Sequence, residues 1–396
     1  ATNVGPAGDF QSVQWKGTNA FGGDTSFTYD PVTHAVSSSG GIFSTNLLHG
    51  VINVRNPKFG VKADGSDDTA AIQAAVNSLG DGATLLFPQG NYSVKSLYIP
   101  CTSSFTIAGV PGASVKQSPS ATDSMWVLTG TNLCTTHFRD ILLDGNWQNM
   151  PRSQGTNQVD KSSIIDVTDT LAHVFIHDVI LTNSVRAAVR FGGATLNMSD
   201  SQILNIKTNS CDGNGTIGYT YGVFAQPTGY APQLAVDFRN CLLSSCVGAD
   251  TNLVYLTGSG IWISEQANAV NPLDNTNRYR FNIDGCRAYG IGGWYGVAEG
   301  APFEVYNGAD GGRFVNNTID TYAQSGIKAQ RTANVQIIGN TILNGYNNVQ
   351  DTNYMGISSA IIFEPEAREG VSPFIGPRTN ETHYGAVIAN NFILNF

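Results

Sequence analysis

Short apolar triplets, each preceded by one polar or small residue, recur along most of the chain after residue 83. Their shortest spacing, 23 residues, suits one coil of a solenoid that is built from three short strands and three turns. Longer spacings indicate loops inserted into single coils, and surface loops of this kind commonly build binding sites. The pattern predicts an all-β solenoid. Its copies are at residues 140–143, 178–181, 201–204, 240–243, 340–343 and 391–394, with weaker ones at 285–286 and 317–319.

A second set of triplets has a period of two and belongs to another strand of each coil. In residues 165–167, 189–191, 223–225, 261–263, 303–305, 327–329 and 361–363, the outer members are expected to point inward and the middle one outward. Stacked coils lie about 4.8 Å apart, so the middle residues should form one outward column. That column consists of Asp166, Arg190, Phe224, Trp262, Glu304, Lys328 and Ile362.

The second half of residues 56–79 carries the best helix pattern of the chain, because alanines recur on one face together with Ile72 and Val76. Ser66 or Asp67 is expected to be the N-cap, and Gly80 follows as a stop signal. An apolar helix ahead of a long β array is suited to cover the open end of the first coil. We therefore expect a capping segment with a helix at residues 51–82 and the solenoid at 83–396.

Residues 1–50 are polar and rich in turn-forming residues, which is typical of an extended arm or linker. Two alternating strands around Gly22-Gly23 predict a hairpin within this arm.

The start of the capping segment also resembles a known family. FGVKADGSDDT at residues 59–69, followed by Ala71, Ile72, Gln73 and Ala75, resembles the opening of the pectate-lyase-like superfamily of right-handed parallel β-helices. Residues 13–36 resemble a stretch that precedes the β-helix in phage tail and tail-fibre proteins. The resemblance implies a right-handed parallel β-helix that acts as a tailspike depolymerase on a bacterial surface polysaccharide. It also implies a homotrimer with an extracellular location, in a virion tail or as a secreted protein.

Composition and net charge limit the kinds of partner that the chain is expected to bind. Only 13% of the residues are charged, against roughly 25% in an average protein, which is typical of a β-rich extracellular scaffold. The net charge of −9 and the absence of a basic run argue against nucleic acid. No apolar run reaches the roughly 20 residues of a membrane span. No cofactor or metal is predicted, because turn and N-cap roles explain the acids Asp64, Asp67 and Asp68 better than a metal site does.

Two ladders are expected inside the solenoid. Parallel stacking aligns Cys241 with Cys286, which predicts a stack of buried thiols. In a chain of this length we expect all six cysteines to be free thiols rather than disulfides. A turn ladder of asparagines with a structural role is expected at Asn317, Asn340 and Asn391.

Aromatic rings beside acids and bases are what carbohydrate recognition uses, and residues 260–331 are richest in both. Glycoside hydrolysis needs two carboxyl groups about 5–9.5 Å apart, a separation that neighbouring coils supply. Glu265 and Glu304 are the first candidate pair, with Asp310 and Glu299 in reserve. Each of these acids alone is also compatible with a solvated turn. Substrate contacts are expected from Trp262, Arg190, Phe224, Trp294, Tyr295, Tyr306, Lys328 and Arg331.

Two other functions remain open. A polysaccharide lyase acts by β-elimination on a uronic-acid polymer, and Arg190, Lys328, Arg331 and nearby tyrosines could serve as its base and carboxylate-neutralising groups. A non-catalytic receptor-binding or structural fibre module would need only the sugar-binding groove. The chain stops inside a repeat unit at Phe396, so we also expect another chain or a further segment to cover this end.

Overall fold

The computed structural model describes residues 12–16, 21–30, 35–38, 50–130, 132–150, 163–167, 171–208, 217–226, 235–248, 255–264, 279–293, 301–306, 309–322, 325–345, 359–365 and 386–394. The chain divides into two units, Ala1–Val51 and Ile52–Phe396. We describe each unit by itself.

The first unit contains an antiparallel sheet of three strands in the order β1 (Ser12–Lys16), β2 (Phe21–Asp30), β3 (Ala35–Ser38). The hairpin expected in this arm is therefore the β1–β2 pair. The prediction misplaced its turn, because Gly22 and Gly23 lie inside β2 and pair with Trp15 and Gln14 of β1. The turn between the two strands lies outside the described residues.

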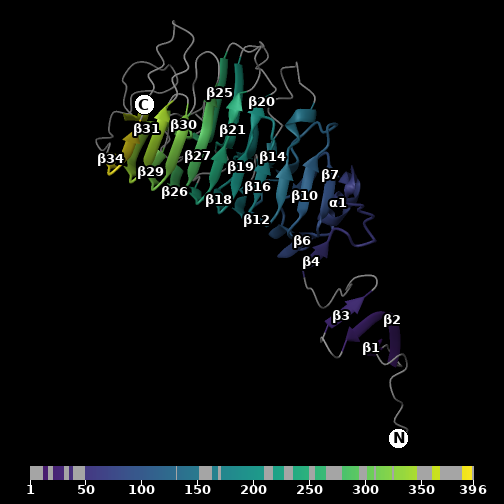
Figure 1. The fold of residues 1–396 in the computed structure, drawn as a ribbon. Coiled ribbons are helices and arrows are strands. Elements are labelled where there is room, and N and C mark those ends of the chain that lie inside the picture. The colour runs from purple at the N-terminus through teal and green to yellow at the C-terminus, as the bar shows by residue number, and fades with distance from the viewer. Residues whose placement is uncertain are drawn as a thin grey trace. The chain divides into compact units, whose positions relative to one another are not determined.

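The second unit contains the predicted helix, α1 (Thr69–Asn77), which lies at the start of the solenoid (Figure 1). Its buried face is Ile72, Ala75 and Val76, as the alanine-rich pattern indicated. The N-cap prediction was wrong by one residue, since the N-cap is Asp68. The buried Asp68 carboxylate does not cap the helix but accepts backbone N–H bonds from Lys62 at 2.9 Å and Ala63 at 3.1 Å, and so holds the preceding loop.

The rest of the second unit is a parallel β-helix whose coils present three faces, and neighbouring strands on each face are hydrogen-bonded (Figure 1). Face 1 consists of β8 (Leu97–Pro100), β11 (Trp126–Thr129), β14 (Ser163–Val167), β17 (Ala187–Phe191), β21 (Ile217–Ala225), β25 (Tyr255–Ser264), β28 (Phe303–Tyr306), the first half of β31 (Ser325–Ile338) and β33 (Ser359–Pro365).

Face 2 follows face 1 along each coil, and β4 (Val51–Asn53) lies next to its first strand. It consists of β6 (Ala83–Phe87), β9 (Phe105–Gly109), β12 (Thr135–Arg139), β15 (His173–His177), β18 (Thr195–Ser199), β22 (Ala235–Arg239), β26 (Tyr279–Asp284), β29 (Ala309–Val315), the second half of β31 and β34 (Ala386–Ala389).

Face 3 completes each coil and contains the apolar triplets from which the solenoid was predicted. It consists of β5 (Asp64–Asp67), β7 (Gly90–Val94), β10 (Ala113–Gln117), β13 (Leu142–Asp144), β16 (Ile180–Thr182), β19 (Gln202–Leu204), β23 (Leu242–Ser244), β27 (Arg287–Gly293), β30 (Thr318–Tyr322), β32 (Thr341–Gly345) and β35 (Phe392–Leu394). The short strands β20 (Lys207–Thr208) and β24 (Val247–Gly248) pair beside it, and a 3-10 turn, η1, spans Trp147–Asn149.

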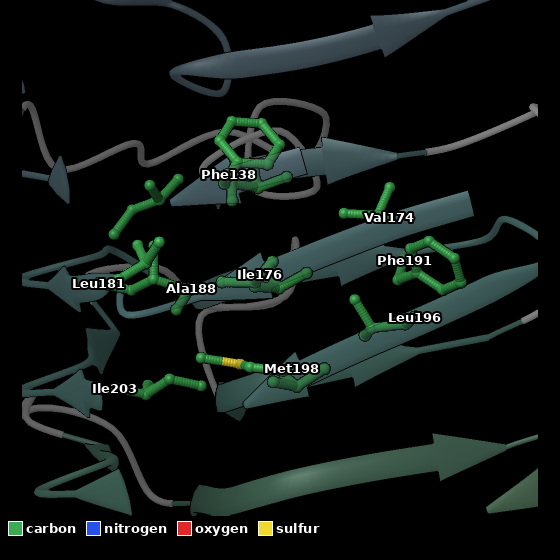
Figure 2. Packing of buried hydrophobic residues seen from close by; sticks show 14 of the residues in the cluster. Phe138, Val174, Ile176, Leu181, Ala188, Phe191, Leu196, Met198 and Ile203 are labelled. Atoms are coloured by element: carbon green, nitrogen blue, oxygen red, sulfur yellow. The ribbon is translucent and has the colours of Figure 1, made fainter. Parts of the chain in front are cut away.

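The core consists of inward side chains that stack on like side chains of the next coil. On face 2, Phe138 is in register with Ile176, and Ile176 with Met198, all of them buried (Figure 2). On face 3, Leu181 lies over Ile203 in the same way. Because alternate residues of a strand point to opposite sides, every outward residue is likewise in register with an outward residue of the next coil.

The turn between faces 2 and 3 places one residue of each coil in the left-handed backbone region, where Asp, Asn and Gly are favoured. These residues are Asp140, Asp178, Asp200, Asn240, Gly285, Asn316, Gly339 and Asn390. In the last three of these turns the next side chain is an asparagine, and the predicted asparagine ladder is confirmed. Asn317 donates to Asn340 Oδ1 and Asn340 donates to Asn391 Oδ1, each at 2.9 Å.

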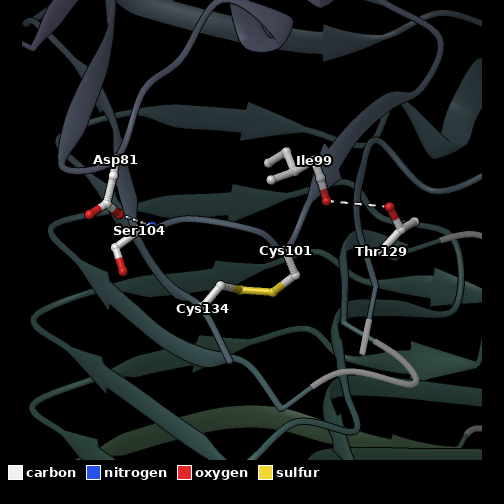
Figure 3. The surroundings of a disulfide bond; sticks show 6 residues. All are labelled: Asp81, Ile99, Cys101, Ser104, Thr129 and Cys134. Carbon is white, nitrogen blue, oxygen red and sulfur yellow. Dashed lines mark hydrogen bonds between the residues drawn. A yellow bond between two sulfur atoms is a disulfide. The ribbon is translucent and has the colours of Figure 1, made fainter. Parts of the chain in front are cut away.

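The cysteine prediction was partly wrong. Cys241, Cys246 and Cys286 are free and buried as expected. Cys101 and Cys134, however, form a disulfide with a Cα–Cα distance of 5.3 Å (Figure 3). The bond joins the turn after β8 to the residue before β12, so it links the face 1–face 2 connections of two successive coils. Cys211 lies outside the described residues.

Candidate functional site

The outward column predicted for face 1 has the observed register. Asp166 pairs with Arg190, Arg190 with Phe224, Phe224 with Trp262 and Trp262 with Glu304. Lys328 and Ile362 continue the column. The residues on either side of each member from Asp166 to Lys328 belong to the buried core, and those beside Ile362 pack against it, which fixes the direction in which these side chains point.

Two aromatic rings occupy the centre of this column. Phe224 and Trp262 are stacked with ring centroids 4.7 Å apart and planes inclined by 11°. Tyr221 adds a third ring, 5.0 Å from Phe224 and 5.8 Å from Trp262. A Cβ on the neighbouring Gly222 would lie 2.4 Å from the backbone oxygen of Gly260, so only glycine permits the two strands to approach here. Rings held in this way form an aromatic platform on the outer surface of the coil.

A buried ion pair follows the rings. Glu304 and Lys328 are only 6% and 8% exposed, and Glu304 Oε1 lies 3.1 Å from Lys328 Nζ. The Ser259 hydroxyl donates to Glu304 Oε2, also at 3.1 Å. Both carboxylate oxygens are therefore engaged, and Glu304 is not the solvated turn carboxylate that remained an alternative in the sequence.

A second acid–base pair precedes the rings. Asp166 is 4% exposed, and its Oδ2 lies 3.7 Å from Arg190 NH1 and accepts a hydrogen bond from Ser124 at 3.2 Å. The column therefore reads acid, base, ring, ring, acid, base. Each charge is matched by its neighbour along the solenoid axis, which offsets part of the cost of burying it.

The two described acids of this column are too far apart to act on one bond. Asp166 and Glu304 are separated by four steps of about 4.8 Å, or roughly 19 Å. Paired carboxyl groups in glycoside hydrolases lie about 5–9.5 Å apart. A carboxyl partner for Glu304 has to come from a different segment.

Several candidate residues cannot be placed at the level of their side chains. Glu265, Glu299, Trp294 and Tyr295 lie outside the described residues. For Tyr306, Asp310 and Arg331 the structure describes the strands but not the side chains, so what can be stated is that they belong to β28, β29 and β31.

Sequence analysis missed three polar or aromatic neighbours of the column, namely Tyr221, Ser259 and Ser124. The first two had a signal in the sequence. Tyr221-Gly222-Val223-Phe224 and Ser259-Gly260-Ile261-Trp262 align residue by residue and are paired in the structure. Tyr221 and Ser259 each lie three residues before a member of the column, Phe224 and Trp262 respectively. Aligning the two copies of the repeat would have placed them next to each other.

The described residues contain no group of three or more His, Cys, Asp or Glu side chains arranged to hold a metal ion. Among the acids once considered for a metal, Asp64 accepts a hydrogen bond from the Ser66 backbone and Asp67 from the Thr69 backbone. These are turn-type bonds of the kind that the sequence suggested. The one α-helix in the described part of the chain is too short to cross a membrane.

Stacked parallel coils with three faces, covered at one end by a helix, place the chain in the class of parallel β-helix proteins. A family model described as rhamnogalacturonase A/epimerase, pectate lyase-like, matches residues 51–291, which is more than half of the sequence. The chain belongs to this family, in agreement with the resemblance at residues 59–69.

Three solved structures with a similar fold are only 13–15% identical to this chain. ORF18 of Geobacillus virus E2 is 13% identical at a TM-score of 0.37, with 85% of this chain and 65% of that chain covered. The N-terminal fragment of bacteriophage Phi29 gene product 12 is 15% identical at a TM-score of 0.38, with 87% and 56% covered. This chain therefore spans less than two thirds of these two proteins.

The A-module of the mannuronan C-5 epimerase AlgE4 from Azotobacter vinelandii is 15% identical at a TM-score of 0.38, with 87% of this chain and 97% of that chain covered. No curated protein sequence matches the chain.

Proposed function

We propose that the chain is a tailspike-like depolymerase that binds a bacterial surface polysaccharide on face 1 and cleaves it by glycoside hydrolysis. The observation that carries the proposal is the stacked Phe224–Trp262 pair between two acid–base pairs, Asp166–Arg190 with a buried acid and Glu304–Lys328 with both members buried. Aromatic faces pack against the apolar side of a sugar ring, while charged groups beside them hydrogen-bond its hydroxyls. The column from Asp166 to Ile362 spans six steps of about 4.8 Å, long enough for several sugar units of a polymer that follows the solenoid axis.

Glu304 is the described carboxylate best placed for chemistry, because it lies one step from Trp262. Its contacts with Lys328 and Ser259 fix the orientation of the carboxylate. An ion-paired carboxylate offers an electron pair, so we assign Glu304 the role of base or nucleophile. The general acid is then a second carboxyl group within about 5–9.5 Å of it. Glu265 is the first candidate for that role, with Asp310 and Glu299 behind it.

The other proposed substrate contacts divide by chemistry. Phe224 and Trp262 provide ring faces, and we expect Trp294, Tyr295 and Tyr306 to extend the aromatic surface. Arg190 is about one third exposed beside its partner Asp166 and can donate to sugar hydroxyls or to an acidic substituent. Lys328 and Arg331 are assigned the same kind of contact near Glu304.

An activity screen with product masses tests this proposal. The purified chain is incubated with bacterial capsules, lipopolysaccharides, alginate and pectin, and fragments are weighed by mass spectrometry. Hydrolysis adds one water per cut. A product without added water and with ultraviolet absorbance establishes β-elimination instead, and points to Arg190 and Lys328 as the groups that act on a uronate. Retained binding without any product establishes a non-catalytic glycan-binding module.

Two substitutions then test the site. Glu304→Gln should lower the cleavage rate by at least about 100-fold, while the affinity for the glycan is retained. Asp320→Asn is the matched control, because it makes the same carboxylate-to-amide change on face 3, where the amide oxygen can still accept the bond from Asn344. Cleavage by the Glu304→Gln variant at the rate of the control would remove Glu304 from the mechanism.

We also propose that the protein acts outside the cell, in a virion tail or as a secreted enzyme, and assembles as a homotrimer. The Cys101–Cys134 disulfide supports the location, because such bonds persist in oxidising compartments. The trimer rests on the resemblance of residues 13–36 to phage tail proteins. Light scattering coupled to size exclusion tests it, since a trimer has three times the mass of one chain and a monomer would contradict it.

A further inference from the structure

Face 2 carries a cavity that the proposed cleavage site does not use. It has a volume of about 430 Å³, within the range of small-molecule sites, and lies across the four adjacent strands β12, β15, β18 and β22. Its outward lining residues form two columns along the solenoid axis. One column is His137, Phe175, Asn197 and Asp237, and the other is Arg139, His177, Ser199 and Arg239.

One end of the cavity has an aromatic wall. His137 and Phe175 are stacked with centroids 4.7 Å apart and planes inclined by only 12°. This separation equals the spacing between strands, so the ring planes lie across the solenoid axis. His137 covers one face of Phe175, and the other face is directed towards the next step of the column. That step is occupied by Asn197, a short side chain that leaves room beside the ring.

The opposite end has a fixed polar wall. Arg239 donates to both oxygens of Asp237, from Nε to Oδ1 at 3.1 Å and from NH2 to Oδ2 at 2.6 Å. Asn282 of the next coil donates to Asp237 Oδ1 at 2.7 Å. These bonds orient the Asp237 carboxylate, which is 26% exposed, while the Arg239 side chain is 61% exposed and accessible to a ligand.

His177 and Ser199 line the side of the cavity. His177 Nδ1 lies 2.8 Å from Ser199 Oγ, and its Nε2 lies 2.9 Å from Asp178 Oδ2. Arg139 also lines the cavity, is exposed, and forms no salt bridge with any residue that the structure describes. The cavity thus offers one free aromatic face together with several oriented donors and acceptors.

We propose that this cavity is a second saccharide-binding site, in which a sugar ring stacks on the open face of Phe175 and its hydroxyl groups bond to Asn197, Asp237 and Arg239. The chemistry fits because a pyranose has an apolar face for the ring and hydroxyls that both donate and accept. In this arrangement the sugar ring stacks on Phe175 at the step where the column has Asn197 instead of a third ring. The site lies on a different face from Trp262 and does not depend on face 1 cleaving its substrate. A second point of attachment would retain a long glycan while face 1 acts on it.

Saturation-transfer NMR of the full chain with defined probes tests the site. The probes are the methyl glycosides of glucose, galactose, mannose, rhamnose and N-acetylglucosamine, together with trigalacturonic acid. The Asn197→Phe variant places a third ring in the stack and fills the space intended for the sugar. Phe175→Leu keeps an apolar side chain of similar size but removes the ring, and Trp262→Ala removes the platform on face 1. Thermal melting identifies any variant that fails to fold.

We expect at least one probe to bind the wild-type chain, and binding at this cavity to weaken by at least about tenfold in Asn197→Phe and Phe175→Leu. The same signal should persist in Trp262→Ala. If all signals disappear in Trp262→Ala and persist in both face 2 variants, the inference is overturned, whereas the proposed function stands. If no probe binds the wild-type chain although face 1 cleaves a polysaccharide, the inference is also overturned. Loss of cleavage in Glu304→Gln or Trp262→Ala bears on the proposed function and not on the face 2 site.

Discussion

At the scale of single residues, the face 1 column contains one acid–base pair that is buried on both sides, Glu304 and Lys328. Removing water from a carboxylate and an ammonium is costly, and their mutual attraction offsets the cost only while both are present. Glu304 and Lys328 are each less than a tenth exposed and 3.1 Å apart. Either charge alone in this environment would lower the stability of the fold, so the two residues contribute to stability only as a pair.

Replacing Lys328 with methionine should therefore destabilise the protein by about 3–5 kcal/mol, because Glu304 would be left charged and buried without its partner. The double variant Glu304→Gln/Lys328→Met should recover most of this loss, since no buried charge remains. Urea unfolding measures the difference. Lys116→Met is the control, because the half-exposed Lys116 lies 3.8 Å from Asp144 in a looser pair that contributes at most about 1 kcal/mol. Equal effects of the two lysine variants would show that burial of the Glu304 pair has no energetic weight.

His137 offers a second test at this scale. Partial burial of the ring, and then the nearby Arg139 guanidinium, lower the pKa of His137 below its usual value of about 6.5. The unfolded chain therefore takes up this proton at a higher pH than the folded chain does. The stability that the neutral ring contributes is complete above about pH 6.5 and is lost as the pH falls through the lower folded pKa.

Arg139→Gln should raise the pKa of His137, but not to its usual value, because burial is the larger cause. The neighbours of His137 in register, Thr106 and Phe175, are uncharged and do not mask the effect. An NMR titration of the imidazole protons measures it. Arg313→Gln is the control, since Arg313 lies five steps along the same column, well beyond the Debye length of about 8–10 Å. A lower or unchanged pKa of His137 in Arg139→Gln would contradict the assigned cause.

The residue scale also shows where sequence reasoning reached its limit at the site. The order of the column from Asp166 to Ile362 followed from the period of two and the repeat alone. The depth at which Glu304 and Lys328 are buried did not follow, because a middle residue that points away from the core can still be covered by its neighbours. The contact of Ser259 with Glu304 depends on side-chain length and rotamer, which the repeat does not encode.

At the scale of elements, the turns between faces 2 and 3 hold the coils together by side-chain ladders. Each asparagine in the ladder satisfies backbone groups that the sharp turn would otherwise leave without partners. Asn340 donates to the backbone carbonyl of Phe314 and to the side-chain Oδ1 of Asn391, and its own Oδ1 accepts from the backbone N–H of Asn317. Asn340 is fully buried, so these groups cannot turn to water instead.

Asn340→Ala should therefore destabilise the protein by about 3 kcal/mol, because several buried polar groups lose their partner together. Thermal or urea unfolding with intrinsic fluorescence measures the loss. Gln336→Ala on the neighbouring strand β31 is the control, since its side chain is exposed and its removal should change the stability by less than about 0.5 kcal/mol. An effect of Asn340→Ala within the range of this control would show that the ladder is incidental.

The disulfide is the element-scale feature that the sequence did not predict. The asparagine ladder was visible because its members recur at the same place in the repeat. Cys101 and Cys134 lie in connections between faces 1 and 2, before the clear copies of the triplet begin, so their alignment could not be deduced. The S–S bond closes a loop with a sequence separation of 33.

Chain entropy for a loop of this length gives a stabilisation of about 3–4 kcal/mol. The double variant Cys101→Ser/Cys134→Ser should accordingly unfold at lower urea than the wild type. Reductant should lower the wild-type midpoint towards that of the variant and leave the variant unchanged. Three free thiols are buried in the described residues, and these should react with an alkylating agent only on unfolding. A wild-type midpoint that does not respond to reductant would contradict a stabilising role for the bond.

At the scale of the whole molecule, the solenoid converts a sequence repeat into surfaces with different chemistry. Face 1 presents rings between ion pairs, whereas face 2 presents a cavity between a stacked His–Phe pair and a fixed Asp–Arg pair. The fold was predictable because the repeat, the cap and the family resemblance agree. Whether Glu265 or Glu299 approaches Glu304 was not predictable, because neither belongs to a copy of the repeat in the sequence and no register relates them to Glu304.

The central claim is that the outward column of face 1 is the surface on which the glycan binds and is cleaved. The most direct measurement is a crystal structure of the Glu304→Gln variant with an oligosaccharide of the cleaved polymer. We expect sugar rings to lie over Phe224 and Trp262, with a glycosidic bond within reach of residue 304. An oligosaccharide bound at full occupancy on another part of the molecule, with the rings of Phe224 and Trp262 uncovered, would contradict the claim.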